Sequence, residues 1–344
     1  MAVKSDVLRK AKEAKNDEFY TQLDDIVKEI AQHKDYVRHF QGKTVLCNCD
    51  DPEWSSFVEF FRKFFKKLGL KKMICTHYEK DGSSSYKLEW SGEKIHGDTV
   101  NMIKTPLQGN GDFRSEECIE LLKEADIVVT NPPFSLFREY VAQLMEYGKQ
   151  FVILGNTNAV AYKEFFPLLR DNKVFVGYKS PSGGMWFTVT DEFRDKVLSG
   201  EAKATYRMER NSAGKEVMYC NCPAMWYTNL DLDKSHEPLI LTKNYMGNEG
   251  RYPHYDNYDA IDCNKISDIP KDYWGKIGVP LTYMAVHCAD QFDVIGGGTG
   301  DMAKQIGIGK NYRGRTDLAI TENGKSRCPY NRIIIQRKPI LQED

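Results

Sequence analysis

The feature that most constrains the fold is a buried strand that passes through a rigid turn into a helix. Residues 126–130 read Asp-Ile-Val-Val-Thr, a short apolar run typical of a strand covered on both faces. Residues 131–134 read Asn-Pro-Pro-Phe, and residues 136–145 then carry apolar side chains at the three-to-four spacing of an amphipathic helix. Because consecutive prolines interrupt strand and helix alike, the chain must turn between the two elements. This pattern predicts one strand-turn-helix step of a parallel sheet.

The same alternation extends over the first two thirds of the chain. Apolar runs at residues 45–47, 73–75 and 151–154 predict further buried strands, and residues 94–98 are another candidate strand. A phenylalanine-rich helix pattern lies between the first two runs, and Ser115 is placed to cap a later helix. The sequence therefore predicts an α/β fold in which a mainly parallel sheet carries helices on both faces.

The character of the sequence changes near residue 230. Residues 231–344 are richer in Pro, Gly, Asn and Tyr and lack long helical periods, so we expect a separate region of loops and short strands. The glycine run at residues 296–300 lacks the lysine and the helix start of a phosphate-binding P-loop, and we expect a mobile surface loop there.

Composition and charge exclude several classes of protein. Hydrophobic residues make up 41% of the chain and charged residues 28%, as in a folded globular protein and unlike a disordered one. We find no signal peptide and no apolar run long enough to span a membrane, so we expect a cytoplasmic protein without a membrane partner. A formal net charge of −1 gives no broad basic surface, so any DNA contact must come from local patches such as residues 304–315.

The nine cysteines are predicted to be reduced thiols, because disulfides are rare in cytoplasmic proteins. Cys47 and Cys49, like Cys220 and Cys222, flank a single residue, whereas paired zinc ligands are usually separated by about two to four. In an extended strand each pair would point to one face, so we interpret them as buried small side chains. No metal is expected.

The turn at residues 131–134 also has a chemical interpretation. The exocyclic amine of a base such as adenine is a poor nucleophile, because its lone pair is delocalised into the ring. The Asn131 side-chain oxygen and the Pro132 carbonyl would both accept from that amine and favour the pyramidal geometry that frees the lone pair. Pro132 and Pro133 lack an N–H, so these acceptors stay free, and Phe134 would offer a flat face for stacking a base. The alternative is an ordinary rigid turn with a core aromatic residue.

Several segments together connect the chain to a known family. They are Asp17-Glu-Phe-Tyr-Thr-Gln22, Cys47-Asn-Cys-Asp-Asp-Pro52, Gly111-Asp-Phe-Arg-Ser115, Ala125-Asp-Ile-Val-Val-Thr-Asn-Pro-Pro-Phe-Ser-Leu-Phe-Arg-Glu-Tyr140, Tyr255-Asp-Asn-Tyr-Asp-Ala260 and Gly278-Val-Pro280. With these segments in this order, the chain resembles the EcoRI-type adenine-specific (N6) DNA methyltransferases over most of its length. The resemblance implies a Rossmann-like methyltransferase sheet plus a loop-rich C-terminal region, S-adenosylmethionine as methyl donor and double-stranded DNA as substrate.

The resemblance assigns cofactor roles to two early segments. Phe19, Tyr20 and Thr21 resemble the segment that packs beside the methionine end of the cofactor. An acidic residue at the end of the first strand, Asp50 or Asp51, is expected to contact the methionine amino group. In most methyltransferases the loop after this strand carries glycines, whereas here it reads Cys-Asp-Asp-Pro-Glu-Trp-Ser-Ser, a departure that the EcoRI type shares.

Two later segments are expected to bind the rest of the cofactor. Asp112 and Phe113 resemble the pair that binds the cofactor adenine, with a carboxylate for its amino group and a ring against its face. Glu79, after the second strand, is a candidate for holding the ribose hydroxyls, and His77 is interpreted as a structural loop residue. For each carboxylate the alternative is a solvated loop charge.

The resemblance also implies a reaction path. The sulfonium methyl of S-adenosylmethionine is already a reactive electrophile, so we expect direct in-line transfer without a metal or a covalent cysteine. An amine inside a duplex cannot reach the cofactor, so the target base must swing out. It would stack on Phe134, and an aromatic residue of the segment 183–187, such as Trp186, would cover its other face.

The two regions are expected to divide these tasks. Residues 1–230 are predicted to form the S-adenosylmethionine-binding catalytic domain, and residues 231–344 are predicted to recognise the DNA target. Arg313 and Arg315 would read guanine edges, hold phosphates or serve as plain surface charges. A restriction-modification role implies a cognate restriction endonuclease that acts separately.

Other functions stay open from the residues alone. The same turn occurs in enzymes that methylate glutamine side chains of proteins, although those carry a glycine-rich first loop. Methylation of the cytosine N4 amine is chemically close, but that group more often has Ser at the position of Asn131. A different class altogether is a catalytically inactive, sequence-specific DNA-binding protein, which the altered first loop motivates.

Overall fold

The computed structural model describes residues 19–49, 51–79, 84–92, 102–179, 182–210 and 214–339. These residues form two compact units. The first holds the described residues up to Thr157 and those from Gly177 to Leu230, and the second holds Asn158–Val176 and the described residues from Asp231 onward. The boundary that we predicted at residue 230 places the segment 158–176 in the first domain, whereas the contacts of this segment place it in the second unit. The candidate strand at residues 94–98 lies outside the described residues.

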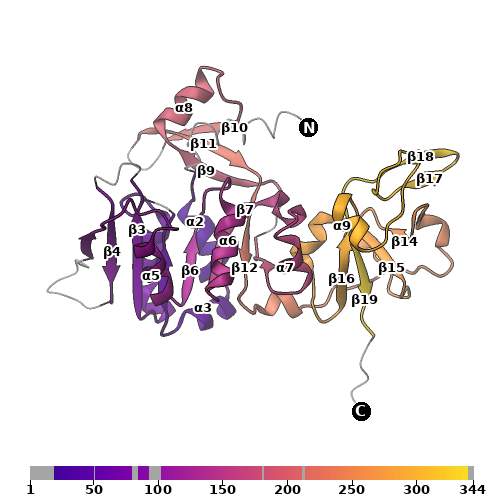
Figure 1. Cartoon of the computed structure of the whole chain (residues 1–344), viewed down its shortest axis with the longest axis horizontal. Coiled ribbons are helices and arrows are strands. Elements are labelled where there is room, and N and C mark those ends of the chain that lie inside the picture. Colours follow the sequence, from indigo (N-terminus) through magenta and orange to yellow (C-terminus); the bar gives the residue numbers. More distant parts are fainter. Residues whose placement is uncertain are drawn as a thin grey trace, which may run out of the picture. The chain divides into compact units, whose positions relative to one another are not determined.

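The first unit is built around a large mixed sheet, in which the strand order is β5-β4-β3-β2-β6-β7-β12 (Figure 1). Its core is parallel and consists of β2 (Thr44–Cys47), β3 (Lys72–His77), β6 (Ile127–Thr130) and β7 (Gln150–Asn156). Antiparallel strands flank this core, namely β4 (Tyr86–Trp90), β5 (Ile103–Pro106) and β12 (Ala224–Thr228). The predicted α/β class is confirmed.

Local sequence signals explain where the helices of this unit begin and end. The Ser55 hydroxyl accepts from the Phe57 backbone N–H at the start of α4, and Gly69 ends that helix with a left-handed φ of 63°. Ser115 caps α5 in the same way through the Cys118 N–H. The helices of the unit are α2 (Leu23–Ile26), η1 (Val27–Ala31), α3 (Lys34–Phe40), α4 (Ser56–Leu68), α5 (Glu116–Glu124), α6 (Phe137–Glu146) and α8 (Asp191–Leu198).

The strand order creates a switch point between β2 and β6. From β2 the chain passes through α4 to β3, whereas from β6 it passes through α6 to β7 in the opposite direction along the sheet. Phe57 of α4 contacts Trp226 of β12, and Phe137 of α6 contacts the adjacent Tyr227. Because neighbouring residues of a strand point to opposite faces, α4 and α6 cover opposite faces of the sheet. In such sheets ligands bind beyond the carboxyl ends of the strands, at the switch point.

A smaller antiparallel sheet completes the first unit. Its order is β1-β9-β11-β10, with β1 (Phe19–Tyr20), β9 (Met185–Val189), β10 (Thr205–Arg210) and β11 (Glu216–Cys222). The ring of Phe19 packs edge-on against Phe187 of β9 and Phe193 of α8, with centroid distances of 6.0 Å and 5.5 Å. A hydrogen bond from Asn131 to the Phe19 carbonyl ties β1 to the end of β6.

The second unit contains short strands, as expected for its sequence. Its sheet has the order β13-β14-β15-β19-β16, with β13 (His254–Tyr255), β14 (Tyr258–Asp262), β15 (Lys276–Pro280), β16 (Phe292–Gly297) and β19 (Arg332–Arg337). The remaining elements are the strand β8 (Phe175–Val176), the hairpin of β17 (Ile320–Glu322) and β18 (Lys325–Arg327), and the helical segments η2 (Thr157–Ala161), α7 (Phe166–Arg170), η3 (Asp233–His236), η4 (Glu249–Arg251), η5 (Ile266–Asp268), η6 (Leu281–Val286) and α9 (Gly300–Gln305). Within the described part of the chain, no helix has the length and apolar surface that a membrane-spanning segment requires.

The glycine run at residues 296–300 is not the mobile surface loop that we expected. Its first residues end β16, and α9 begins at Gly300, so the expectation that no helix starts here is wrong. A Cβ at Gly296 would lie 2.5 Å from the Ile306 side chain, and one at Gly298 would lie 2.5 Å from the Leu318 side chain. Glycine is needed here because apolar side chains pack directly on the backbone.

Candidate active site

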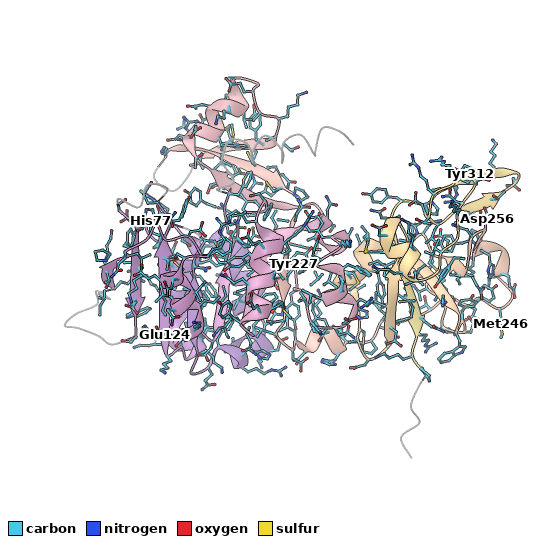
Figure 2. All side chains as sticks on the ribbon, viewed as in Figure 1. His77, Glu124, Tyr227, Met246, Asp256 and Tyr312 are labelled. Carbon is cyan, nitrogen blue, oxygen red and sulfur yellow. The ribbon has the colours of Figure 1, made fainter. Side chains whose placement is uncertain are left out.

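A cavity of about 450 Å³ opens at the carboxyl edge of the parallel strands in the first unit. Figure 2 shows His77 at this edge of the sheet and Glu124 at the opposite edge. Small-molecule sites typically span about 300–1,000 Å³, so the cavity has the size of a ligand pocket. It brings together many of the residues that the sequence suggested, namely Phe19, Tyr20, Asp51, Asp112, Phe113, Asn131 and Pro133.

Asn131 directly follows β6, and its side chain is buried. Its Nδ2 atom donates a hydrogen bond of 2.7 Å to the Phe19 carbonyl oxygen. Because a carbonyl oxygen can only accept, this bond fixes which end of the amide faces β1. The other end, Oδ1, is also buried, and no donor among the described residues reaches it. A buried acceptor without a donor costs about 1–3 kcal/mol, so this atom is suited to accept a hydrogen from a bound ligand.

The rest of the turn keeps a second acceptor available. Pro132 is buried, and its carbonyl oxygen receives no backbone hydrogen bond from the described residues, whereas the Pro133 carbonyl accepts from Leu136 at 2.9 Å and closes the turn. Phe134 is half-buried and does not line the cavity. No other described aromatic ring packs against it.

Strand β1 contributes Phe19 and Tyr20 to the cavity wall. Both residues pair with β9, opposite Val189 and Thr188, so the smaller sheet holds them in place. Thr21 is buried beside them without lining the cavity, and its hydroxyl has no partner among the described residues. The expected segment thus reaches the cavity with its first two residues.

The loop before α5 contributes Asp112 and Phe113. The Asp112 carboxylate accepts from the Arg114 guanidinium, at 2.8 Å from Nε and 2.6 Å from Nη2. These bonds lower the pKa of the Asp112 carboxyl, which is therefore ionised at neutral pH. Phe113 packs edge-on against Tyr140 of α6 with a centroid distance of 5.0 Å, and this contact fixes its ring at the cavity wall.

The segments after β2 and β3 form a further wall. Asp51 lines the cavity with a carboxylate oxygen 3.6 Å from His77 Nδ1, whereas Glu79, 3.6 Å from His77 Nε2, does not line it. Asp50 lies outside the described residues. Gly111 has a φ of +77°, and a Cβ there would lie 2.2 Å from the His77 carbonyl oxygen. Only glycine permits this close approach of its loop to the end of β3.

Sequence reasoning missed several residues of this wall. Asn48, Cys49, Thr76 and Tyr78 all line the cavity. His77 also lines it, and as the last residue of β3 it is not the loop residue that we expected. The Tyr140 hydroxyl donates to Asn48 Oδ1, and the buried Thr76 hydroxyl has no partner among the described residues. These residues lie at or just beyond the carboxyl ends of β2 and β3. The switch-point rule, applied to each predicted strand end, would have found them.

The cysteine pairs behave differently from each other. β2 ends at Cys47, so Cys49 lies beyond the strand and lines the cavity, and the expectation that Cys47 and Cys49 share a buried strand face is wrong. Cys220 and Cys222 do lie in one strand, where burial raises the pKa of the Cys220 thiol to about 11. Among the described residues, no group of His, Cys, Asp or Glu is arranged to hold a metal ion.

The residues expected to bind DNA lie outside the cavity. Trp186 is on β9, partly exposed, with the Arg207 guanidinium 4.5 Å from its ring centroid. Arg313 and Arg315 are exposed in the second unit, in the loop between α9 and β17.

Comparisons with known proteins reveal relatives of this chain. The family described as "Adenine-specific methyltransferase EcoRI" matches residues 7–338. Type II methyltransferase M.EcoRI of Escherichia coli is 41% identical over 345 residues, which cover 96% of each chain. Type II methyltransferases M.MpnI of Mycoplasma pneumoniae and M.MgeORF184P of Mycoplasma genitalium are 37% and 35% identical, over 96% of this chain and 97% and 98% of their own. No solved structure matches the chain. With nearly its whole length matched and the Asn131 turn at its cavity, the chain belongs to the EcoRI family of adenine-specific methyltransferases.

Proposed function

We propose that this protein transfers a methyl group from S-adenosylmethionine to the N6 amine of adenine in double-stranded DNA. Its family is adenine-specific, and its relatives are named Type II methyltransferases. The observation that carries the proposal is Asn131 Oδ1, a buried acceptor that the Phe19 contact orients and that no described donor satisfies. The main sheet is proposed to be Rossmann-like, because its parallel core has the switch-point order of nucleotide-binding folds.

The turn after β6 suits activation of an aromatic amine. The Asn131 Oδ1 atom and the Pro132 carbonyl oxygen would accept the two hydrogens of the adenine amine, which favours the pyramidal form whose lone pair can attack. Burial strengthens both hydrogen bonds, since the local dielectric constant is low. Because the amide is already oriented by Phe19, these acceptors need no reorganisation during the reaction.

The cavity beside this turn fits S-adenosylmethionine in size and in chemistry. When bound, this cofactor supplies an electrophilic methyl group. The Asp51 carboxylate would accept from its ammonium group and the Asp112 carboxylate from its adenine amine, while Tyr20 and Phe113 offer apolar ring surface. The buried Thr76 hydroxyl, which has no partner among the described residues, is a further group for the ligand to satisfy.

We propose that the target base leaves the duplex and stacks on Phe134, a half-buried ring that packs against no other described aromatic ring. Trp186 lies under Arg207 and outside the cavity, so its part in stacking has no geometric support. Target recognition is assigned to the second unit, and a restriction-modification role would add an endonuclease that acts separately.

The test is transfer of labelled methyl from S-adenosylmethionine to mixed-sequence duplex DNA, followed by nucleoside analysis. We expect N6-methyladenine from the parent protein and from Asn244→Ala, which changes an exposed asparagine of the second unit, but not from Asn131→Ala. N4-methylcytosine as the product would overturn the adenine assignment. Labelled protein glutamine, or cofactor binding without transfer to any acceptor, would point to the alternative functions.

A further inference from the structure

The loop at residues 309–317 presents arginines that lack a charged partner. Arg313 and Arg315 are exposed, and neither guanidinium contacts a carboxylate within the described residues. The loop's own acid, Asp317, accepts instead from the Gly300 backbone N–H at 3.4 Å. Many other arginines of the chain are paired with a carboxylate, including Arg114, Arg170, Arg194, Arg327 and Arg332. Arg313 lies over the Tyr312 ring of the same loop, 5.0 Å from its centroid, and no described carboxylate neutralises the positive charge of the loop.

The loop is nevertheless held in one conformation by the buried side chain of Asn311. Its Oδ1 atom accepts from the backbone N–H groups of Arg313 at 2.8 Å and Arg315 at 3.2 Å. Its Nδ2 atom donates to the Asp317 carbonyl at 3.0 Å, and its backbone pairs with the Arg315 carbonyl and the Gly314 N–H. All these contacts lie within the loop, so its backbone is ordered without help from the arginine side chains.

A second asparagine clamps both ends of the loop to the unit's core. Asn257 Nδ2 donates to the carbonyl oxygens of Gly309 at 2.8 Å and Asp317 at 2.9 Å, and its Oδ1 accepts from Ala319 at 3.0 Å. Next in the chain, Ile308 and Leu318 are buried in the hydrophobic core. Figure 2 shows Tyr312 at the same end of the second unit as Asp256. The Asp256 carboxylate accepts a hydrogen bond from the hydroxyl of Thr321, in the first strand of the β17–β18 hairpin.

We propose that this loop reads base edges of the DNA target through Arg313 and Arg315. The inference rests on the proposed function, because it names the part of the protein that selects the methylated site. A guanidinium matches the two acceptors of guanine in the major groove. That match requires the backbone that carries the arginine to be held in a fixed position. A phosphate contact is less demanding, because lysine also binds phosphate, as a point charge. The Asn311 and Asn257 clamps provide a rigidity that phosphate binding alone does not require.

The experiment first maps the sites that the parent protein methylates, then measures kcat/KM on a duplex with one site and on duplexes with single base-pair changes. Arg313→Lys and Arg315→Lys keep the charge but remove the planar fork. Arg170→Ala, which removes a partly exposed arginine elsewhere in the second unit, is the control. We expect each lysine variant to lose roughly ten- to hundred-fold in discrimination at one base pair, and the control to match the parent.

Two results would overturn the inference. If the lysine variants discriminate like the parent while Arg313→Ala and Arg315→Ala weaken binding equally for all sequences, the arginines hold phosphates. If all the variants match the parent, the loop is plain surface. Selection of bound duplexes from a random pool reads the same preference without catalysis. A parent that selects a site but does not methylate it would contradict the proposed function, and the loop would still be tested.

Discussion

The turn at residues 131–134 in the first unit and the loop at residues 309–317 in the second are each organised by a buried asparagine. In the first, Asn131 uses only its Nδ2 atom, toward Phe19, and its Oδ1 atom is left without a described donor. In the second, both ends of the Asn311 amide bond the protein itself. The same side chain thus serves as a candidate catalytic group in one place and as a positioning group in the other.

The difference teaches that the unpaired atom indicates function better than the residue type does. An amide has four hydrogen-bonding sites, and the tertiary structure decides how many are used. Where all are used, the neighbours carry the chemistry, here Arg313 and Arg315. Where one buried site is left over, the asparagine itself is the candidate.

The largest effect is expected when the unpaired acceptor of the first region is removed. Asn131→Ala should lower the single-turnover rate of methyl transfer by about 10²–10³-fold, the usual cost of losing one preorganised electrostatic contact. Cofactor binding, measured by calorimetry, should change little, because the cavity keeps its carboxylates. A rate near that of the parent would remove the contrast between the two asparagines.

The second unit should show its own acid sensitivity. Burial lowers the pKa of His287 to about 4, with His287 Nε2 2.9 Å from Asn172 Oδ1. In the unfolded chain this histidine titrates near pH 6.5, so between about pH 6.5 and 4 the unfolded state binds the extra proton and the free energy of unfolding falls as pH falls. The loss should approach about 3 kcal/mol at pH 4.

Denaturant unfolding at several pH values checks this slope. His287→Gln, which cannot titrate, should flatten the slope between about pH 6.5 and 4. Stability from the depressed pKa of Asp112 in the first unit is lost at lower pH, below about 4. An unchanged slope in the variant would show that His287 does not control acid stability.

An intermediate effect is expected at the cavity wall of the first unit. Gly111→Ala places a Cβ against the His77 carbonyl at a φ of +77°, and we expect about 2 kcal/mol of destabilisation together with weaker cofactor binding. Gly148→Ala is the matched control, since φ there is +60° and a Cβ would meet nothing within 4 Å. Equal unfolding free energies for the two variants would mean that backbone strain alone, and not the close approach, matters.

The smallest effect on stability is expected at Asn311. Asn311→Ala leaves backbone groups without their side-chain partner, but water can reach these groups. The free energy of unfolding should therefore fall by only about 1 kcal/mol. Sequence discrimination should nevertheless fall, because the backbone that carries Arg313 and Arg315 is no longer held in place. Asn311→Asp keeps the side-chain acceptor, so this variant should retain much of the discrimination. If sequence discrimination falls in these variants only in proportion to their free energy of unfolding, Asn311 has a structural role and does not position the arginines.

Local patterns predicted the parts of the site that lie within one stretch of chain. The β6 strand, its proline turn and helix α6 were visible as apolar runs and prolines, and Ser115 was visible as a cap. Thr76 was missed because its importance comes from the order of the strands. The glycines at 296–298 were misjudged because the side chains that pack on them are distant in the sequence.

The sequence by itself determined the α/β class, the strand-turn-helix step and the family, since periodicity and ordered motifs are properties of the chain alone. Only the tertiary structure decided which polar atoms are satisfied. Asn131 and the carbonyl that orients it are 112 residues apart, whereas the backbone N–H groups that donate to Asn311 Oδ1 are two and four residues away. A hydrogen bond between distant segments leaves no periodic signal, because it depends on where folding places two backbones.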